Sequence, residues 1–216
     1  MIPGLEALSA HHVATIQQPL PAGFGVRWVW AQNGIFKRGA NATMEILLQV
    51  GTSDCVVPGL TSLLAGVRWS VWPRRIPAHW LDALLADARQ AGTTRQPIEK
   101  QYFFVHRNGA ARLIAPRNQV GTAANVHYAM PTDEHILVDA HSHHQLAGGA
   151  FFSGTDDRDD TGLSVSVVIG HIFSRPEILC RLNVYGHHQI VPAITLFDGL
   201  GPFVDKAGVY DADIDH

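Results

Sequence analysis

Cysteine is scarce in this sequence. Cys55 and Cys180 are the two cysteines among 216 residues, and they form no C-x-x-C pair. Two cysteines are too few for a disulfide framework of the kind that holds small secreted domains together. Because isolated cysteines behave as small apolar side chains, we expect both thiols to be buried.

Long apolar runs and an excess of basic residues are also lacking. No stretch approaches 18 consecutive apolar residues, and the first residues, MIPGLEALSAHHVATIQQPL, contain neither a basic segment nor a long apolar core. The formal net charge is −3. We therefore expect no membrane span, no signal peptide, a cytoplasmic location and no nucleic-acid partner.

The composition that remains is that of a globular protein. Hydrophobic residues make up 46% of the chain and charged residues 16%, which is enough apolar material for a sizeable core. Histidine is the unusual residue, with 13 copies. Because imidazole binds metals and titrates near neutral pH, this number favours a metal or acid–base site.

The first third of the chain has the pattern of β-strands. Residues 23–31 are rich in aromatic and β-branched side chains, and the Asn33-Gly34 pair that follows is typical of a hairpin turn. Residues 44–50 and 67–72 have the same composition. Pro73 and Pro77 then interrupt the pattern, so we place a domain boundary near residue 75, between a β-rich module (1–75) and a second domain (76–216).

The second domain alternates one helix with several strands. Residues 78–92 carry apolar side chains at helical spacing and end at a glycine. Apolar runs then predict strands at 100–106, 110–116, 135–143, 163–172, 177–186 and 189–197, the first two joined by a turn at Arg107-Asn108-Gly109. The chain as a whole is predicted to be of the α+β class.

The strand predicted at 135–143 ends in His141-Ser142-His143. Successive side chains of a strand point to opposite faces, so the two histidines share a face and both can reach one metal ion. A catalytic zinc usually takes three protein ligands and leaves one position open. The third ligand must then come from elsewhere, and the aspartates at 156–160 are close in sequence.

Ser153-Gly154-Thr155-Asp156 has the form S-x-x-D. In a helical turn, positions i and i+3 lie on one face, so Ser153 and Asp156 can both face the same metal ion. The same pattern is also typical of a helix N-terminal cap, and the two interpretations are compatible because a cap can position a ligand. Asp157 is an alternative ligand.

With these residues the chain resembles the JAB/MPN metalloprotease family, whose JAMM motif is an upstream glutamate followed by H-[ST]-H and S-x-x-D. The resemblance covers roughly residues 76–190 and implies a mixed sheet flanked by helices. More narrowly, AFFSGTDDRDD is similar to the A proteins of the plasmid-borne PRTRC system. Nine residues separate His143 from Ser153, where the family has about seven, and this longer loop contains Gly148-Gly149.

The resemblance assigns the upstream glutamate to Glu99, 42 positions before His141 and at the start of a predicted strand. Two other glutamates are weaker candidates. Glu134 lies next to Asp133 in a predicted turn, and Glu45 falls outside the matched region.

The resemblance also implies a reaction. Zn²⁺ would be held by His141, His143 and Asp156, Glu99 would act as general base, and Ser153 would donate a hydrogen bond to the developing oxyanion. The substrate would be a protein or peptide, with the tail of a ubiquitin-like protein as the first candidate, and no organic cofactor is expected. The alternative is an MPN-like scaffold that binds a protein partner and performs no chemistry. The oligomeric state cannot be deduced from the sequence.

Overall fold

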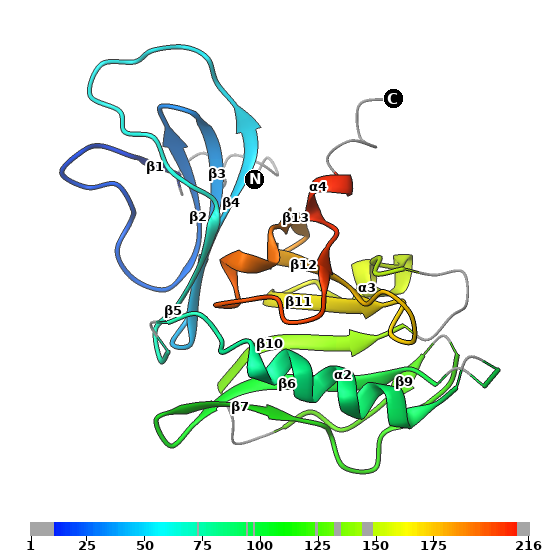
Figure 1. Ribbon diagram of the computed structural model, residues 1–216. Coiled ribbons are helices and arrows are strands. Elements are labelled where there is room, and N and C mark those ends of the chain that lie inside the picture. The colour runs from blue at the N-terminus through cyan, green and yellow to red at the C-terminus, as the bar shows by residue number, and fades with distance from the viewer. Residues whose placement is uncertain are drawn as a thin grey trace.

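The computed structural model describes residues 11–72, 74–93, 95–96, 98–123, 125–131, 135–143 and 149–210 (Figure 1). These residues form a five-stranded sheet, a seven-stranded sheet and a two-stranded ribbon, together with one long helix. The five-stranded sheet stands at an angle over one end of the seven-stranded sheet. No helix among these residues is long and apolar enough to span a membrane.

The N-terminal sheet has the strand order β1-β2-β3-β4-β5. Its strands are β1 (His11–Val13), β2 (Gly25–Ala31), β3 (Gly34–Ala40), β4 (Met44–Thr52) and β5 (Gly66–Trp69). The predicted hairpin between β2 and β3 is present, but its turn occupies Gln32 and Asn33, one residue earlier than the Asn-Gly pair indicated. Gly34 is already in β3, where a Cβ would lie 2.0 Å from the carbonyl oxygen of Gly51, so no larger residue fits.

The larger sheet has the order β13-β12-β11-β10-β6-β7, with β14 paired to β12. Its strands are β6 (Lys100–Arg107), β7 (Ala110–Ile114), β10 (His135–Ser142), β11 (Leu163–Gly170), β12 (Glu177–Val184), β13 (His187–Val191) and β14 (Val204–Asp205). β10 and β11 run parallel, whereas β10 and β6 run antiparallel, so the sheet is mixed as predicted. The ribbon consists of β8 (Val120–Gly121) and β9 (Val126–His127).

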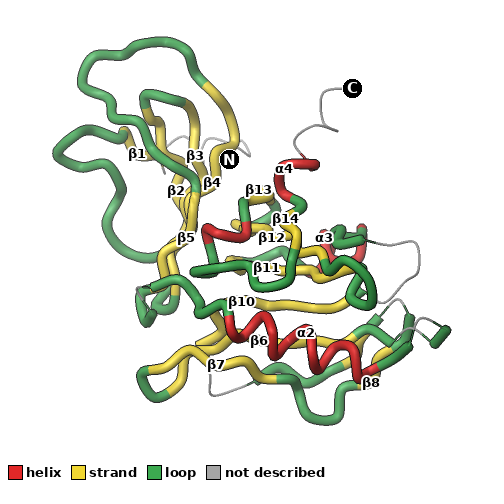
Figure 2. Tube along the Cα trace, in the orientation of Figure 1, coloured by secondary structure: helices red, strands yellow, loops and turns green. Residues whose placement is uncertain are grey.

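Helix α2 (His79–Ala91) lies along one face of the larger sheet, as Figure 2 shows. Leu81, Leu84, Leu85 and Ala88 recur at helical spacing and are buried against the sheet. Burying each leucine stabilises the fold by about 1.5–3 kcal/mol, which explains why the predicted helix forms here.

The α+β class is confirmed, but a sheet flanked by several helices is not. Apart from α2, the helices of the described residues are short: α3 (Gly154–Asp159), α4 (Ala207–Tyr210) and the 3₁₀ helix η1 (Ala193–Thr195).

One hydrophobic cluster connects the two sheets. Met44 and Ile46 of β4 belong to the same cluster as Leu182 of β12 and the leucines of α2. β3 approaches the larger sheet so closely that a Cβ on Gly39 would lie 2.5 Å from the Leu163 side chain. The boundary predicted near residue 75 lies in the connection between β5 and α2, across which this cluster is continuous.

Two local predictions are wrong. Cys180 is buried as expected, but Cys55 is exposed, because it lies in the connection between β4 and β5. The strand predicted at 189–197 ends at Val191, since Pro192 begins the 3₁₀ helix η1. Proline has no N–H to donate to a neighbouring strand, so it ends the pairing here.

Candidate metal centre

Strand β10 brings the two histidines to one side of the larger sheet. Ala140 and Ser142 are fully buried on the face that carries α2, so His141, which alternates with them, points to the opposite face. His143 follows the strand, and its backbone N–H donates to the Ile169 carbonyl of β11 at 2.8 Å. The backbone from His141 to His143 is therefore held by the neighbouring strands β6 and β11.

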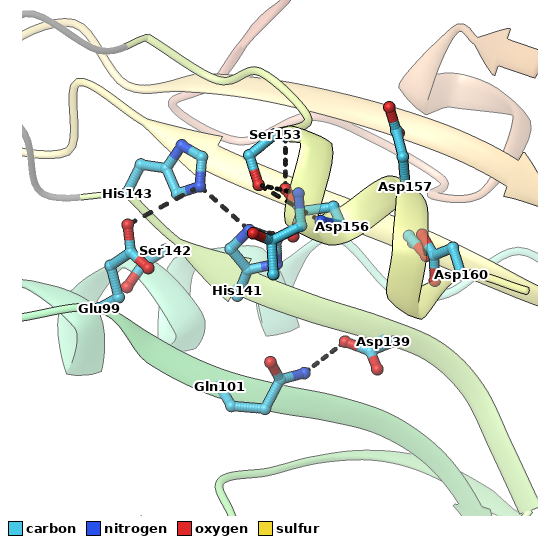
Figure 3. Close-up of polar contacts among 12 residues, drawn as sticks. Glu99, Gln101, Asp139, His141, Ser142, His143, Ser153, Asp156, Asp157 and Asp160 are labelled. Atoms are coloured by element: carbon cyan, nitrogen blue, oxygen red, sulfur yellow. Dashed lines mark hydrogen bonds and ion pairs between the residues drawn. The ribbon is translucent and has the colours of Figure 1, made fainter. Parts of the chain in front are cut away.

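His141, His143 and Asp156 converge at one point (Figure 3). The Nε2 atoms of the two imidazoles are 3.1 Å apart, and Nε2 of His141 is 3.5 Å from Oδ1 of Asp156. The ligand atoms of all three residues lie within 4.8 Å of one another. Two predicted ligands from β10 and its end thus meet the predicted ligand from α3.

These three residues fit a zinc ion. Zn²⁺ binds histidine nitrogen at about 2.0–2.1 Å in a tetrahedral arrangement, which separates neighbouring ligand atoms by roughly 3.3 Å. The 3.1 Å between the two Nε2 atoms and the 3.5 Å from Nε2 of His141 to the Asp156 carboxylate oxygen are close to this value. Burial lowers the pKa of His141, which favours the neutral imidazole that binds metals.

A capping box sets the orientation of Asp156. The Ser153 hydroxyl oxygen accepts the N–H groups of Thr155 (3.2 Å) and Asp156 (3.3 Å), and Oδ2 of Asp156 accepts the Ser153 N–H at 2.6 Å. Oδ1, the other carboxylate oxygen, is the one that faces His141. The S-x-x-D motif is therefore both the helix cap and the source of the third candidate ligand.

Glu99 lies beside this group. It directly precedes β6, its side chain is buried, and its Oε1 is 3.9 Å from Nε2 of His143 (Figure 3). Burial, and secondly the negative charge of Asp156, raise the pKa of Glu99 to about 7. A carboxyl group with a pKa near neutrality is suited to accept and return protons.

The backbone around Glu99 is held by two contacts. The Glu99 N–H donates to the Thr122 carbonyl at 2.7 Å, and the Lys100 N–H donates to the Ser142 hydroxyl at 3.1 Å. The serine between the two histidines therefore ties the start of β6 to the end of β10. The rival Glu45 lies on β4, where it pairs with Arg38 at 2.6 Å, and Glu134 lies outside the described residues.

The group opens into a cavity of about 300 Å³. Its walls combine the candidate site residues with further aromatic and polar side chains: Gln101, Asn125, Tyr128, Asp139, Phe151, Phe152 and Ser166. Asp139 accepts a hydrogen bond from Gln101 of the neighbouring strand (Figure 3). Burial raises the pKa of Asp139 to about 7.

Arg181 was not identified from the sequence as a residue near the site, although the pattern of polar residues in two strands indicates it. Ser164 and Ser166 in β11, and Arg181 and Asn183 in β12, are polar residues two positions apart within otherwise apolar strands. Such spacing places them on one face. Strand pairing puts Ser166 next to both Asp139 and Arg181, so this is the face of His141.

The mixed sheet and the histidine–histidine–aspartate group define an α+β protein with a candidate metal site. A family described as prokaryotic homologs of the JAB domain matches residues 68–183, which is more than half of the chain and includes every candidate site residue. The chain belongs to this family. A search among curated proteins found no match. JAB domains include zinc isopeptidases and inactive scaffolds, so membership leaves the activity open.

Proposed function

We propose that the chain is a zinc-dependent hydrolase of the JAMM type that cleaves a peptide or isopeptide bond. The observation that carries this proposal is the convergence of His141, His143 and Asp156 beside the buried Glu99, at one wall of a cavity. A protein that only binds a partner has no need for a buried carboxyl group next to two imidazoles, because burying such a group is unfavourable.

Glu99 acts as the general base and then as the general acid. Zinc bound to the three ligands would lower the pKa of a coordinated water to about 7 and polarise the scissile carbonyl. Glu99 removes a proton from the attacking water and transfers it to the leaving amine. Its raised pKa means that the carboxylate and the acid are both accessible near neutral pH.

Ser153 donates a hydrogen bond to the oxyanion that develops on the carbonyl. Its oxygen accepts two backbone N–H groups, and a hydroxyl that accepts in this way still has its hydrogen to donate. Ser153 also lines the cavity. The two N–H bonds hold its oxygen in place before substrate arrives, which is how such a donor is most effective.

The proposed substrate is an extended chain segment, such as the tail of a ubiquitin-like protein. A cavity of about 300 Å³ is at the small end of ligand pockets and takes a few residues, whereas a folded domain would stay outside. Phe151, Phe152 and Tyr128 supply apolar wall area for such a segment. Within the family, AFFSGTDDRDD supports a closer relation to the PRTRC A proteins.

The first test is the metal content of the purified protein. We expect about one zinc per chain by elemental analysis, and none in His141→Ala/His143→Ala. His135→Ala is the matched control, because His135 lies on the same strand with an exposed side chain outside the group. Absence of zinc from the parent after zinc is supplied would favour the scaffold.

The second test is hydrolysis. The zinc-loaded parent should cleave a fluorogenic ubiquitin-like tail peptide or an isopeptide-linked lysine peptide, and Glu99→Gln should retain zinc but lose turnover. Zinc binding without cleavage of either peptide would leave the metal site intact and refute the hydrolase assignment for these substrates. Near-normal cleavage by Glu99→Gln would refute the role of Glu99.

A further inference from the structure

Helix α3 carries the candidate ligand Asp156, yet it has no apolar anchor. It has six residues, Gly154–Asp159, none of them buried. Helices this short are not stable by themselves in water, and most helical stability in proteins comes from a packed apolar face. Something other than hydrophobic packing must hold α3 against the sheet.

The sequence of α3 adds to the difficulty. Asp156, Asp157, Asp159 and Asp160 place four carboxylates within five positions. Like charges this close repel one another, and helix α3 contains one basic residue, the exposed Arg158. A cation from another element is needed to hold these carboxylates together.

Arg181 of β12 supplies that cation. Its side chain is 4% exposed, and its guanidinium group donates from Nη1 to Asp157 and from Nη2 to Asp160 at 2.7 Å. Asp157 lies directly after Asp156, and Asp160 ends the helix. One planar guanidinium group therefore pairs with carboxylates at both the middle and the end of α3. The single ammonium group of a lysine cannot reproduce this geometry.

The same guanidinium group also contacts the residue before the helix cap. Its central carbon lies 3.9 Å from the ring centroid of Phe152, a stacking contact between cation and aromatic ring. Phe152 immediately precedes Ser153. Arg181 thus contacts the chain on both sides of Ser153 and Asp156.

Side chains of the larger sheet also contact the end of α3. Oδ2 of Asp160 also accepts the Ser166 hydroxyl at 2.7 Å, and Asn183 donates to Ser166 at 2.8 Å. Ser166 and Arg181 are paired residues of β11 and β12. These contacts of α3 therefore end on β11 and β12 of the larger sheet.

We propose that Arg181 is the positioning residue of the metal centre: it fixes α3 and Phe152 on the sheet, and so places Asp156 and Ser153 beside His141 and His143. The inference rests on the proposed zinc site. It also explains how the longer loop between His143 and Ser153 is tolerated, because Arg181 holds α3 through Asp157 and Asp160, which both follow that loop.

The test is the zinc affinity of folded protein. Parent, Arg181→Met, Arg181→Lys and Arg112→Met are purified without metal, and each zinc dissociation constant is measured by competition with a chromophoric chelator. Arg112 is the matched control, an exposed arginine on β7. Residues that orient metal ligands typically change affinity by about 10- to 100-fold, and we expect this loss for Arg181→Met, a smaller loss for Arg181→Lys and none for Arg112→Met.

Cobalt(II) provides a second measurement that a purely structural role would not change. With all variants saturated, the visible absorption of cobalt reports the coordination geometry, and Arg181→Met should differ from the parent while Arg112→Met should not. If Arg181→Met fails to fold, Asp160→Asn removes the charge of one of the two carboxylates that Arg181 pairs with and should weaken zinc binding in the same direction. Thermal unfolding of each metal-free variant shows whether the fold is intact.

The outcomes separate the two proposals. A parent that binds no zinc refutes the metal site and this inference together. A parent that binds zinc, with unchanged affinity and cobalt spectrum in folded Arg181→Met and Asp160→Asn, refutes only the positioning role of Arg181.

Discussion

Replacing Glu99 with glutamine is expected to stabilise the metal-free protein above pH 7, although it removes the proposed general base. The Glu99 side chain is 8% exposed, and its charged form has lost most of its hydration. Burial, followed by the charge of Asp156, raises the pKa of Glu99 from 4.5 to about 7. The carboxylate is therefore less stable in the folded chain than in the unfolded one.

The sign and size of the effect follow from this shift. Between pH 4.5 and pH 7 the folded state binds more protons at Glu99 than the unfolded state does, so the free energy of unfolding falls as pH rises through this window. One pKa unit corresponds to about 1.4 kcal/mol, so the full shift costs about 3 kcal/mol at pH 8. Glutamine has the same shape and no charge, so it avoids this cost.

The assay is thermal unfolding in the presence of a chelator, from pH 4.5 to pH 8. For a chain of this size, about 3 kcal/mol corresponds to roughly 6–12 °C in Tm. Glu99→Gln should exceed the parent by this amount at pH 8 and match it at pH 4.5. Asp54→Asn, which removes an exposed carboxylate, should match the parent at both. An equal Tm difference at both pH values, or a less stable variant at pH 8, would refute the reasoning.

Three further predictions concern the surroundings of the site. Ser153→Ala should lower kcat by about 10²–10³-fold in steady-state kinetics, because the oxyanion donor is lost. It should also lower the free energy of unfolding by about 1 kcal/mol in a denaturation experiment, because the helix cap is lost. An unchanged kcat would exclude the donor role. A Cβ at Gly170 would lie 2.3 Å from the backbone that leads to Ser153, so Gly170→Ala should lower both Tm and zinc affinity, whereas Gly162→Ala, which meets nothing within 4 Å, should change neither. The Trp69 indole N–H donates to the Leu137 carbonyl at 3.1 Å, from one sheet to the other. Trp69→Phe should therefore lower the free energy of unfolding in urea by roughly 1–3 kcal/mol and leave zinc affinity unchanged. A weaker zinc affinity would show that the contact between the sheets supports the site.

Local patterns predicted the elements that carry the site. The apolar run 135–143 indicated a strand ending in two histidines on one face, and β10 has this form. The S-x-x-D motif indicated a helix cap, and the capping box is present. Both predictions succeeded because strand alternation and helix capping depend on residues a few positions apart.

Where a pattern depended on distant neighbours, the sequence was insufficient. Nothing in the residues around Cys55 showed that it would lie exposed between two strands, because burial depends on what packs over a segment. Glu99 was chosen over its rivals by resemblance. The structure adds the physical basis: antiparallel pairing of β6 with β10 sets Lys100 opposite Ser142 and so brings Glu99 within reach of His143.

The sequence by itself determined the face that the two histidines share and the cap that orients Asp156, and it left Asp156 and Asp157 both open as the third candidate ligand. Tertiary structure alone decided that Glu99 loses its hydration beside these donors, and that Arg181, from a strand later in the chain, pairs with Asp157 within helix α3 and with Asp160 at its end. The reason is physical: side-chain type and local spacing are written in neighbouring residues, whereas burial and long-range charge pairing exist only once the strands have paired.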